Sequence, residues 1–316
     1  MKSMLFTASF KLVRALLGIL PTSLTVRLFR YSRNVFSIRI NEILEEQLYT
    51  PLLKGNSTVL ALPRIIVPIS VERKMMIRVG DNSQRIYWCG QFDEVANYLL
   101  LHLREADSFI DIGANCGFMT LVASSQITGA HIYCFEPNPD VYRDLINNLR
   151  LNNIDANTFN LALSNKKERC RLFVEDGAFG GGSMLTNWQR RELLPGEKLP
   201  TTFHEVEADL FDNLWKGISS QAPAGPGKII IKLDAEGFEL NIVSGMSAFL
   251  TAEASRITLL IEVYESEYNA AVKALSAHGF VCFSILSDGT TTAPVRPAKN
   301  RFNNYCFKKA QQEKSE

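Results

Sequence analysis

Two acidic residues follow the most apolar strand-like segment of the chain. Residues 228–233 predict a buried strand, and Asp234 and Glu236 come directly after it. In open α/β sheets, ligands bind outside the carboxyl ends of the strands, where a carboxylate can orient an acceptor and take its proton. Asp234 and Glu236 are therefore the predicted catalytic residues. The alternative is that they cap the following helix and complement its dipole.

A glycine-bearing turn stands earlier in the chain, where residues 111–118 read DIGANCGF between a predicted strand and a predicted helix. Gly113 permits a tight turn, and Gly117 permits close approach of the backbone to a ligand. The G-x-x-x-G spacing departs from the G-x-G-x-x-G fingerprint that binds a pyrophosphate. A ligand without a pyrophosphate therefore fits this turn better.

A carboxylate ends the next predicted strand, because Glu136 follows residues 131–135. It stands roughly 20 residues after the glycine turn, where an acidic side chain can accept hydrogen bonds from both ribose hydroxyls of an adenosine. The turn and the carboxylate are each common alone, so the prediction rests on their joint spacing. A nucleoside without bridging phosphates indicates S-adenosylmethionine as the cofactor.

Three motifs occur in a fixed order: DIGANxG at 111–117, FEPNP at 135–139 with N-x-x-x-x-N at 147–152, and IKLDAEGxE at 231–239. Together they resemble the FkbM family of methyltransferases, from about residue 109 to 263. The resemblance implies a class I methyltransferase fold, S-adenosylmethionine as cofactor, and O-methylation, often of sugars or polyketide-type products.

The same resemblance assigns the cofactor-binding residues. The glycine turn would border the methionine part of the cofactor, and Glu136 would hold its ribose. Asn160 and Ala162, in the region of the third predicted strand, would lie near the adenine. The full predicted set is Asp111, Gly113, Ala114, Asn115, Gly117, Glu136, Asn138, Asn160 and Ala162.

The elements that position these residues alternate between strand and helix from residue 109 onward, which predicts a mostly parallel sheet covered on both faces. The predicted fold is a Rossmann-like class I methyltransferase fold with a seven-stranded sheet. Its last two strands, 280–286 and 302–307, form an antiparallel edge hairpin. Asn138 is the predicted N-cap of a helix over 138–151. The other predicted strands are 158–163, 169–174, 204–206 and 257–263, and the other predicted helices are 118–125, 238–250 and 268–278.

A run of glycines at 177–182 predicts a loop, because no Gly-Lys-Ser/Thr follows to make it a P-loop. The loop would either close over acceptor and cofactor or serve as a plain linker. Two further side chains stand near the acidic motif. Lys232 is expected to pair with an acidic neighbour, and Glu262 either borders the acceptor site or forms a salt bridge.

The N-terminal part is interpreted as an extension, residues 1–104, before a methyltransferase domain at 105–316. It is predicted to be helical, followed by a hairpin of residues 75–79 and 85–89 and a helix over 91–104. The first 50 residues carry seven basic and three acidic groups. Such a stretch lies on an anionic membrane surface, here through residues 1–40, or packs as a cap on the main domain or on a second subunit of an oligomer.

The composition narrows the classes of function. The 34 basic and 33 acidic residues give a net charge of +1, which offers no electrostatic footprint for a nucleic acid. No apolar run reaches the roughly 18 residues of a membrane span. The six cysteines lack metal-binding spacing and the four histidines are scattered, so no metal is expected. Buried free thiols and a cytoplasmic, or membrane-peripheral, location are expected instead.

The sequence thus predicts an S-adenosylmethionine-dependent O-methyltransferase that acts on a hydroxyl of a sugar, polysaccharide or secondary metabolite. One alternative is a nicotinamide-dependent oxidoreductase on a similar fold, against which the missing third glycine argues. Another is a protein that binds the cofactor without turnover. The Asp/Asn-Pro-Pro-aromatic motif of DNA methylation is absent after residue 233, where the chain reads DAEG.

Overall fold

The computed structural model describes residues 64–68, 73–78, 84, 94–175, 178–185, 202–219, 227–299 and 301–309. The chain forms two compact units, Met1–Phe92 with Asp176–Phe179, and Asp93–Glu175 with Gly180–Glu316. The predicted division at residue 104 remains a prediction. In the described part of the chain, no helix is long and apolar enough to cross a membrane.

The first unit contains a two-stranded antiparallel pair, β1 (Arg64–Pro68) and β2 (Lys74–Arg78). The side chains of Met75 and Ile77 alternate along β2 and are both buried. The predicted partner of this strand, residues 85–89, lies outside the described residues. In the structure, β2 pairs with β1. The helices predicted within residues 1–50 also lie outside the described residues.

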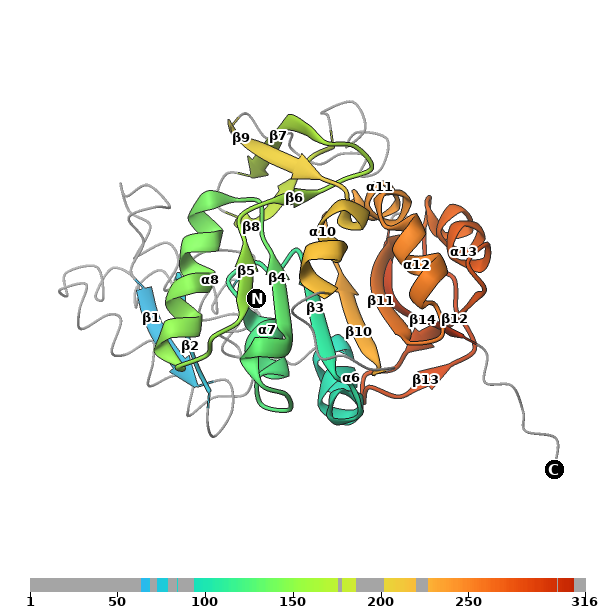
Figure 1. The fold of residues 1–316 in the computed structure, drawn as a ribbon, viewed down its shortest axis with the longest axis horizontal. Helices are drawn as coiled ribbons and strands as arrows, with labels where there is room; N and C mark the ends of the chain where they lie inside the picture. Colours follow the sequence, from blue (N-terminus) through green and yellow to red (C-terminus); the bar gives the residue numbers. More distant parts are fainter. Residues whose placement is uncertain are drawn as a thin grey trace, which may run out of the picture. The chain divides into compact units, whose positions relative to one another are not determined.

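The second unit is built on a large sheet with the strand order β13-β12-β14-β11-β10-β3-β4-β5 (Figure 1). Seven strands were predicted, and the eighth is the two-residue β13 at the edge. The strands are β3 (Ser108–Ile112), β4 (Ile132–Phe135), β5 (Asn157–Phe159), β10 (Ile229–Leu233), β11 (Ile257–Tyr264), β12 (Phe280–Ile285), β13 (Thr291–Thr292) and β14 (Phe302–Lys309).

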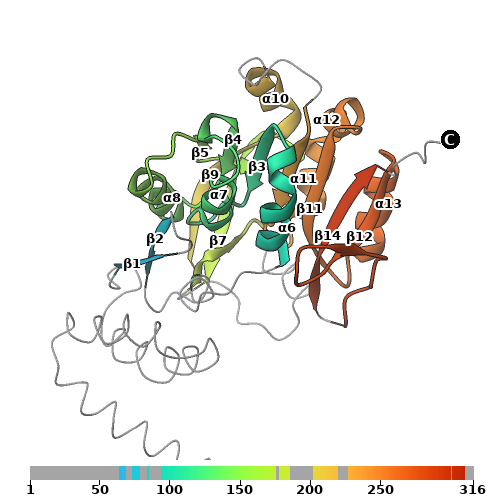
Figure 2. The same cartoon turned by 90° about the horizontal axis from the view of Figure 1, so that it is seen from below.

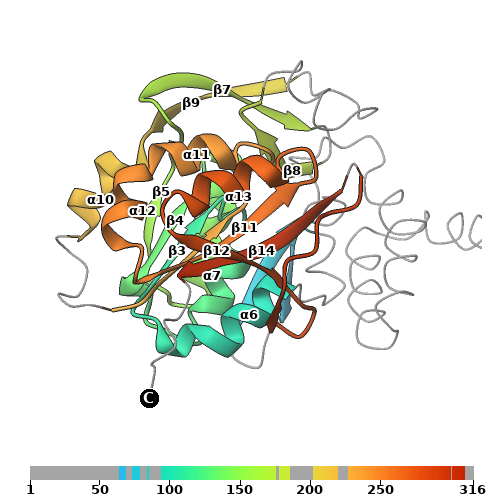
Figure 3. The same cartoon turned by 90° about the vertical axis from the view of Figure 1, so that its right-hand side faces the viewer.

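Helices cover both faces of this sheet. Every residue of β3, β4 and β10 is buried, as expected for parallel strands between two helical layers. Figures 2 and 3 show α6 and α7 on one face and α10, α11 and α12 on the other. The helices are α6 (Glu94–His102), α7 (Phe118–Ala123), α8 (Pro139–Leu151), α10 (Phe211–Ser219), α11 (Glu239–Gly245), α12 (Ser247–Glu253) and α13 (Tyr268–Ser276), with short 3-10 turns at Leu103–Glu105 and Gly129–His131.

The strand order places segments side by side that are distant in the sequence. Strand β3 pairs in parallel with both β4 and β10, although more than a hundred residues separate β3 from β10. The predicted antiparallel hairpin of the last strands is confirmed by the pairing of β12 with β14. Strand β14 also pairs antiparallel with β11, so β14 lies between β11 and β12, and β12 is nearer the edge of the sheet.

A second sheet of four strands has the order β6-β9-β7-β8. The single strand predicted over 158–163 is wrong, because the chain divides it between the two sheets. Strand β5 pairs with β4 and ends at Phe159, whereas β6 pairs with β9. Between them, the side-chain amide of Asn160 donates to the carbonyls of Glu136 and Pro137, which turns the chain away from the large sheet. The strands are β6 (Ala162–Leu163), β7 (Glu168–Glu175), β8 (Ala178–Ser183) and β9 (Thr202–Asp209).

The glycine run predicted as a loop is the strand β8, which lies next to β7 in the small sheet. Glycine disfavours strands by itself, but pairing with a neighbouring strand overrides that preference. A side chain at Gly182 would stand only 3.3 Å from the Leu172 side chain on β7. A glycine inside a strand often marks such a close approach.

Candidate functional site

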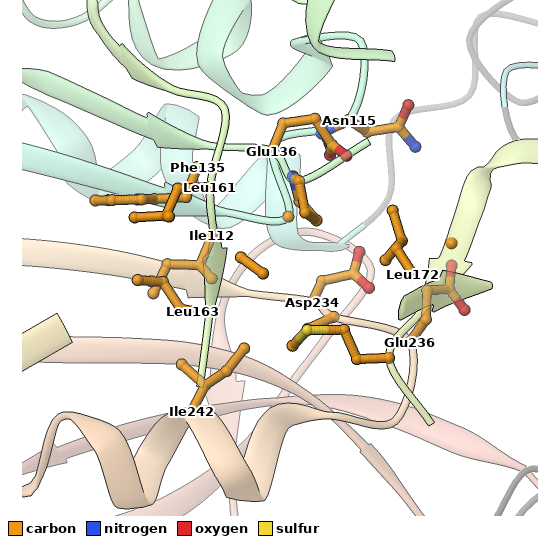
Figure 4. A pocket seen from close by; sticks show the side chains of 16 residues that line it. Ile112, Asn115, Phe135, Glu136, Leu161, Leu163, Leu172, Asp234, Glu236 and Ile242 are labelled. Atoms are coloured by element: carbon orange, nitrogen blue, oxygen red, sulfur yellow. Dashed lines mark hydrogen bonds between the residues drawn. The ribbon is translucent and has the colours of Figure 1, made fainter. Parts of the chain in front are cut away.

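A pocket lies where the small sheet meets the carboxyl ends of β3, β4 and β10. Its space, including the part that opens to solvent, is about 580 Å³. Its walls come from the turn after β3, the end of β4, the connection between β5 and β6, the loop after β10, and strands β7 and β8. Figure 4 shows Phe135 and Leu161 together at one end, and Glu236 with Leu172 at the other.

The glycine turn forms part of this pocket at Gly113. Its backbone has a φ of +71°, and a Cβ built there would lie 1.8 Å from the carbonyl oxygen of Asp234. The amides of Gly113 and Ala114 both donate to the carbonyl of Phe135, at 3.0 Å each. Glycine is therefore required at 113, because three strand ends meet there and leave no room for a side chain.

Glu136 faces the glycine turn from the end of β4 and is only 7% exposed. Its Oε2 accepts from the amide of Asn115 at 2.8 Å, and its Oε1 accepts from the amide of Asn138 at 2.8 Å. Burial raises the pKa of Glu136 to about 7, although these two amide hydrogen bonds act in the opposite direction. Each carboxylate oxygen accepts two hydrogen bonds, so both retain capacity for a ligand hydroxyl.

Four of the nine predicted cofactor residues line the pocket: Gly113, Asn115, Glu136 and Ala162. The buried Asp111 instead lies beneath the turn, where its Oδ2 accepts from the Thr120 hydroxyl at 2.6 Å.

The remaining four predicted residues support the walls. Ala114 is a buried residue of the turn itself. Gly117 begins α7 with a φ of +94°, where a Cβ would lie 2.7 Å from the Leu145 side chain. Asn138 is the predicted N-cap of α8 and accepts from the amide of Asp140 at 3.0 Å. Asn160 fixes the chain after β4, as described above.

Lys232 links the glycine turn to the acidic loop from a buried position on β10. Its Nζ lies 3.4 Å from Asp234 Oδ2 and 3.6 Å from Asp111 Oδ1, and it donates to the carbonyl of Gly113 at 2.6 Å. Burial by itself lowers the pKa of Lys232, but the charges of Asp234 and Asp111 outweigh it and raise the pKa. The predicted pairing of Lys232 with an acidic neighbour is confirmed.

Asp234 and Glu236 both line the pocket from the loop after β10. Neither residue is the N-cap of α11, which is Phe238, whereas complementing the dipole of that helix stays a prediction. The loop is instead held by Glu239, whose Oε1 accepts from the amides of Ala235 at 2.6 Å and Gly237 at 3.3 Å.

Glu262, near the end of β11, stands close to the acidic loop. Burial raises its pKa well above the ordinary value, and the negative charges of Asp234 and Glu236 raise it further. Among the residues that the structure describes, it forms no ion pair. This part of the site is therefore electronegative and suited to a ligand with positive charge.

Leu172 and Met184 line the pocket beside Gly182 of the glycine run, but nothing in the sequence predicts these two residues as part of the site. Apolar side chains in a pocket wall look like core residues in a sequence, and only the glycine run drew attention to this region.

In the described ranges, no three His, Cys, Asp or Glu residues are placed to hold a metal ion. The predicted free thiols are confirmed for the described cysteines, four buried and one partly buried: Cys116, Cys134, Cys282, Cys306 and Cys170.

A mostly parallel sheet with an antiparallel strand inserted near its edge, and a glycine turn facing a carboxylate on the adjacent strand, defines a class I methyltransferase fold. The model of the methyltransferase FkbM domain matches residues 111–282, which is more than half of the chain. The chain belongs to the FkbM methyltransferase family. The matched domain is thus that of an S-adenosylmethionine-dependent methyltransferase.

Solved structures show weaker likeness. The methyltransferase FkbM from Methylobacillus flagellatus is 12% identical with a TM-score of 0.39, covering 71% of this chain and 52% of that one. The tRNA (uracil-54, C5)-methyltransferase of Pyrococcus abyssi, solved with S-adenosyl-L-homocysteine, is 10% identical with a TM-score of 0.38, covering 77% and 44%. The ribosomal protein L11 methylase of Lactobacillus delbrueckii is 10% identical with a TM-score of 0.36, covering 77% and 98%.

The chain thus spans about half of the Methylobacillus protein, 52% of its length. At these TM-scores the family assignment rests on the domain match alone. A comparison with curated proteins finds no match.

Proposed function

We propose that this protein is an O-methyltransferase that transfers a methyl group from S-adenosylmethionine to a hydroxyl of a sugar, polysaccharide or secondary metabolite. One observation carries the proposal: Asp234 and Glu236 line the same pocket as Gly113 and Glu136. Carboxylates suited to proton transfer therefore face the residues suited to the cofactor. Family membership supports methyl transfer over hydride transfer and over binding without turnover.

The residues of the pocket fit S-adenosylmethionine, which supplies an electrophilic methyl group when bound. The apolar end, with Phe135 and Leu161, suits an adenine ring (Figure 4). Glu136 retains lone pairs for two ribose hydroxyls. The electronegative end around Asp234 and Glu236 suits the positive charge that the cofactor carries.

The acidic loop would align the acceptor and remove its proton. Asp234 is 39% exposed, and its Oδ2 is held by Lys232 at 3.4 Å, which restricts the orientation of the carboxylate. An acceptor hydroxyl would donate to a carboxylate oxygen of Asp234 or Glu236. The carboxylate would then take the proton as the new carbon–oxygen bond forms.

We also propose that the acceptor is a small molecule or a glycan and that the enzyme is cytoplasmic. The net charge of +1 supports a neutral acceptor over a nucleic acid. Contact with a membrane surface through residues 1–40, or with a second subunit, rests on the basic balance of that segment, which lies outside the described residues.

The test is a methyl-transfer assay with labelled S-adenosylmethionine against a panel of sugars, oligosaccharides and alcohols, with amines of matched shape beside them. Mass spectrometry and NMR locate the methyl group on oxygen if the proposal holds. A methyl group on nitrogen or carbon would refute it.

Variants of the acidic loop test the base. Asp234→Asn or Glu236→Gln should lower kcat by about 100-fold or more, the usual share of a general base, without loss of cofactor affinity. The exposed Asp155→Asn and Glu205→Gln serve as matched controls. Wild-type turnover of both loop variants would show that neither carboxylate is the base.

A further inference from the structure

We propose that Ser183 and Glu239 are positioning residues that hold the Glu236 turn toward the pocket from two sides. The inference rests on the proposed function, in which Glu236 acts on the acceptor. It concerns two buried groups on different elements, Ser183 at the end of β8 and Glu239 at the start of α11.

The backbone of Glu236 is strained. Its φ is +53°, in the left-handed region that side chains with a Cβ rarely adopt. Of the described residues, only Asn115 and Asn153 share this feature among those other than glycine, and asparagine tolerates it better. Such strain persists only where the surroundings over-determine the conformation, and it gathers at active sites.

The surroundings of Glu236 do over-determine it. From the helix side, Glu239 Oε1 accepts from the amides that flank the strained residue, Ala235 at 2.6 Å and Gly237 at 3.3 Å. From the sheet side, Ser183 Oγ donates to the carbonyl of Glu236 at 2.7 Å. The amide of Leu185 donates to the same Oγ at 3.2 Å, which fixes the direction of the hydroxyl.

Both holding groups are almost fully enclosed, with 1% exposure for Ser183 and 2% for Glu239. Water therefore cannot replace either contact without a rearrangement of the loop. The neighbours of Ser183 in the chain, Gly182 and Met184, line the pocket. The hydrogen bond from Ser183 thus joins the small-sheet wall of the pocket to the loop that bears Glu236.

Glu239 holds the loop as a neutral group. Burial raises its pKa to about 8, and the negative charge of Asp234 acts in the same direction, so the carboxyl is mostly protonated at pH 7. Its Oε1 remains an acceptor in that state, while Oε2 has no hydrogen-bond partner in the described structure. A glutamine, which offers the same acceptor oxygen without charge, is expected to replace it.

The first experiment compares turnover of the full chain. Ser183→Ala and Glu239→Leu should lower kcat by about 10- to 100-fold through misplacement of Glu236, with the Kd for S-adenosylmethionine little changed. Glu239→Gln should recover most of the activity that Glu239→Leu loses. Ser124→Ala is the matched control, because Ser124 is a buried serine whose hydroxyl donates to a carbonyl at 2.8 Å, at the C-cap of α7 and outside the pocket lining. A loss in Glu239→Gln equal to that in Glu239→Leu would overturn the neutral holding role.

A double-mutant cycle separates positioning from general damage. In a Glu236→Gln background, Ser183→Ala should cost little further turnover, because the group that it positions is already gone. Additive losses in kcat would overturn the proposal. Should Glu239→Leu fail to fold, Ser183→Ala still decides, since it removes a single oxygen atom.

A second readout is independent of catalysis. Hydrogen–deuterium exchange of the amides of residues 235–237 should rise in Ser183→Ala and Glu239→Leu but not in Ser124→Ala. Unchanged exchange in both variants would show that these residues do not hold the turn. Full turnover of Glu236→Gln would instead refute the catalytic role of Glu236, and the exchange measurement would still decide whether the turn is held.

Discussion

Replacement of Glu136 should change both the affinity for S-adenosylmethionine and the pH dependence of folding. The carboxylate accepts two amide hydrogen bonds of 2.8 Å and lines the pocket with further lone pairs. Hydrogen bonds to a charged group contribute about 1.5–3 kcal/mol each. The loss of one such bond weakens binding by about 10- to 100-fold, so Glu136→Ala should weaken cofactor binding by at least that much.

The pKa of Glu136 sets the sign of the stability effect. Burial raises it from 4.5 to about 7, so the folded state binds a proton more tightly than the unfolded chain does. The contribution of this group to stability is full below pH 4.5 and is lost as the pH rises through about 7. The shift corresponds to about 3 kcal/mol.

Urea unfolding of the wild type and of Glu136→Gln, between pH 5 and pH 8, measures this difference. Glutamine cannot titrate, so the stability of the wild type relative to Glu136→Gln should fall by about 2.5 kcal/mol over that range. Cofactor affinity of the wild type should also weaken below about pH 7, while that of Glu136→Gln stays level. Parallel stability curves, or unchanged affinity in a folded Glu136→Ala, would refute the assignment of Glu136.

Gly113→Ala and Lys232→Met test the packing around the glycine turn, each beside a second variant for comparison. Gly113→Ala places a Cβ 1.8 Å from the carbonyl oxygen of Asp234 at a φ of +71°, and should lower the free energy of unfolding by about 2–5 kcal/mol. Gly217 lies on a helix, and a Cβ there meets nothing within 4 Å, so Gly217→Ala should raise the free energy of unfolding by up to about 1 kcal/mol. Equal melting temperatures for Gly113→Ala and Gly217→Ala would contradict the geometry. Lys232→Met should cost about 3–5 kcal/mol, because Asp111 is left as a buried charge without its cation. Asp111→Asn in the same chain should recover most of that loss, and no recovery would show that Lys232 acts by packing alone.

The local parts of the fold follow from the sequence. Apolar runs and strand-end glycines give β3, β4 and β10 within a residue or two, and Asn138 caps α8 as its position predicts. These features depend on neighbours in the chain, where hydrophobic period and capping chemistry act directly. The same local signals bring the glycine turn and Glu136 to one pocket.

Features that depend on the pairing of strands far apart in the sequence cannot be predicted from local patterns. Residues 157–163 are apolar enough for one strand, yet Asn160 divides them between two sheets through contacts with the turn after β4. The glycine run forms the strand β8 because it pairs with the neighbouring strand β7. Leu172 and Met184 enter the site through that small sheet, so no local pattern marks them as pocket residues.

The meeting of the cofactor and catalytic motifs is a consequence of strand order. In the parallel register of β3 and β10, Asp111 stands opposite Lys232 and Ile112 opposite Leu233, so the glycine turn and the acidic loop leave the sheet at the same level. From β3 the chain adds β4 and β5 on one side, and later adds β10 and β11 on the other side, so the order of the strands reverses between β3 and β10. Such a reversal opens a crevice between the loops that leave these two parallel strands. Lys232 spans that crevice from below, bonded to Gly113 and paired with Asp234. A ligand seated on the glycine turn therefore lies against the carboxylates of the loop, although the two motifs are separated by more than a hundred residues of chain.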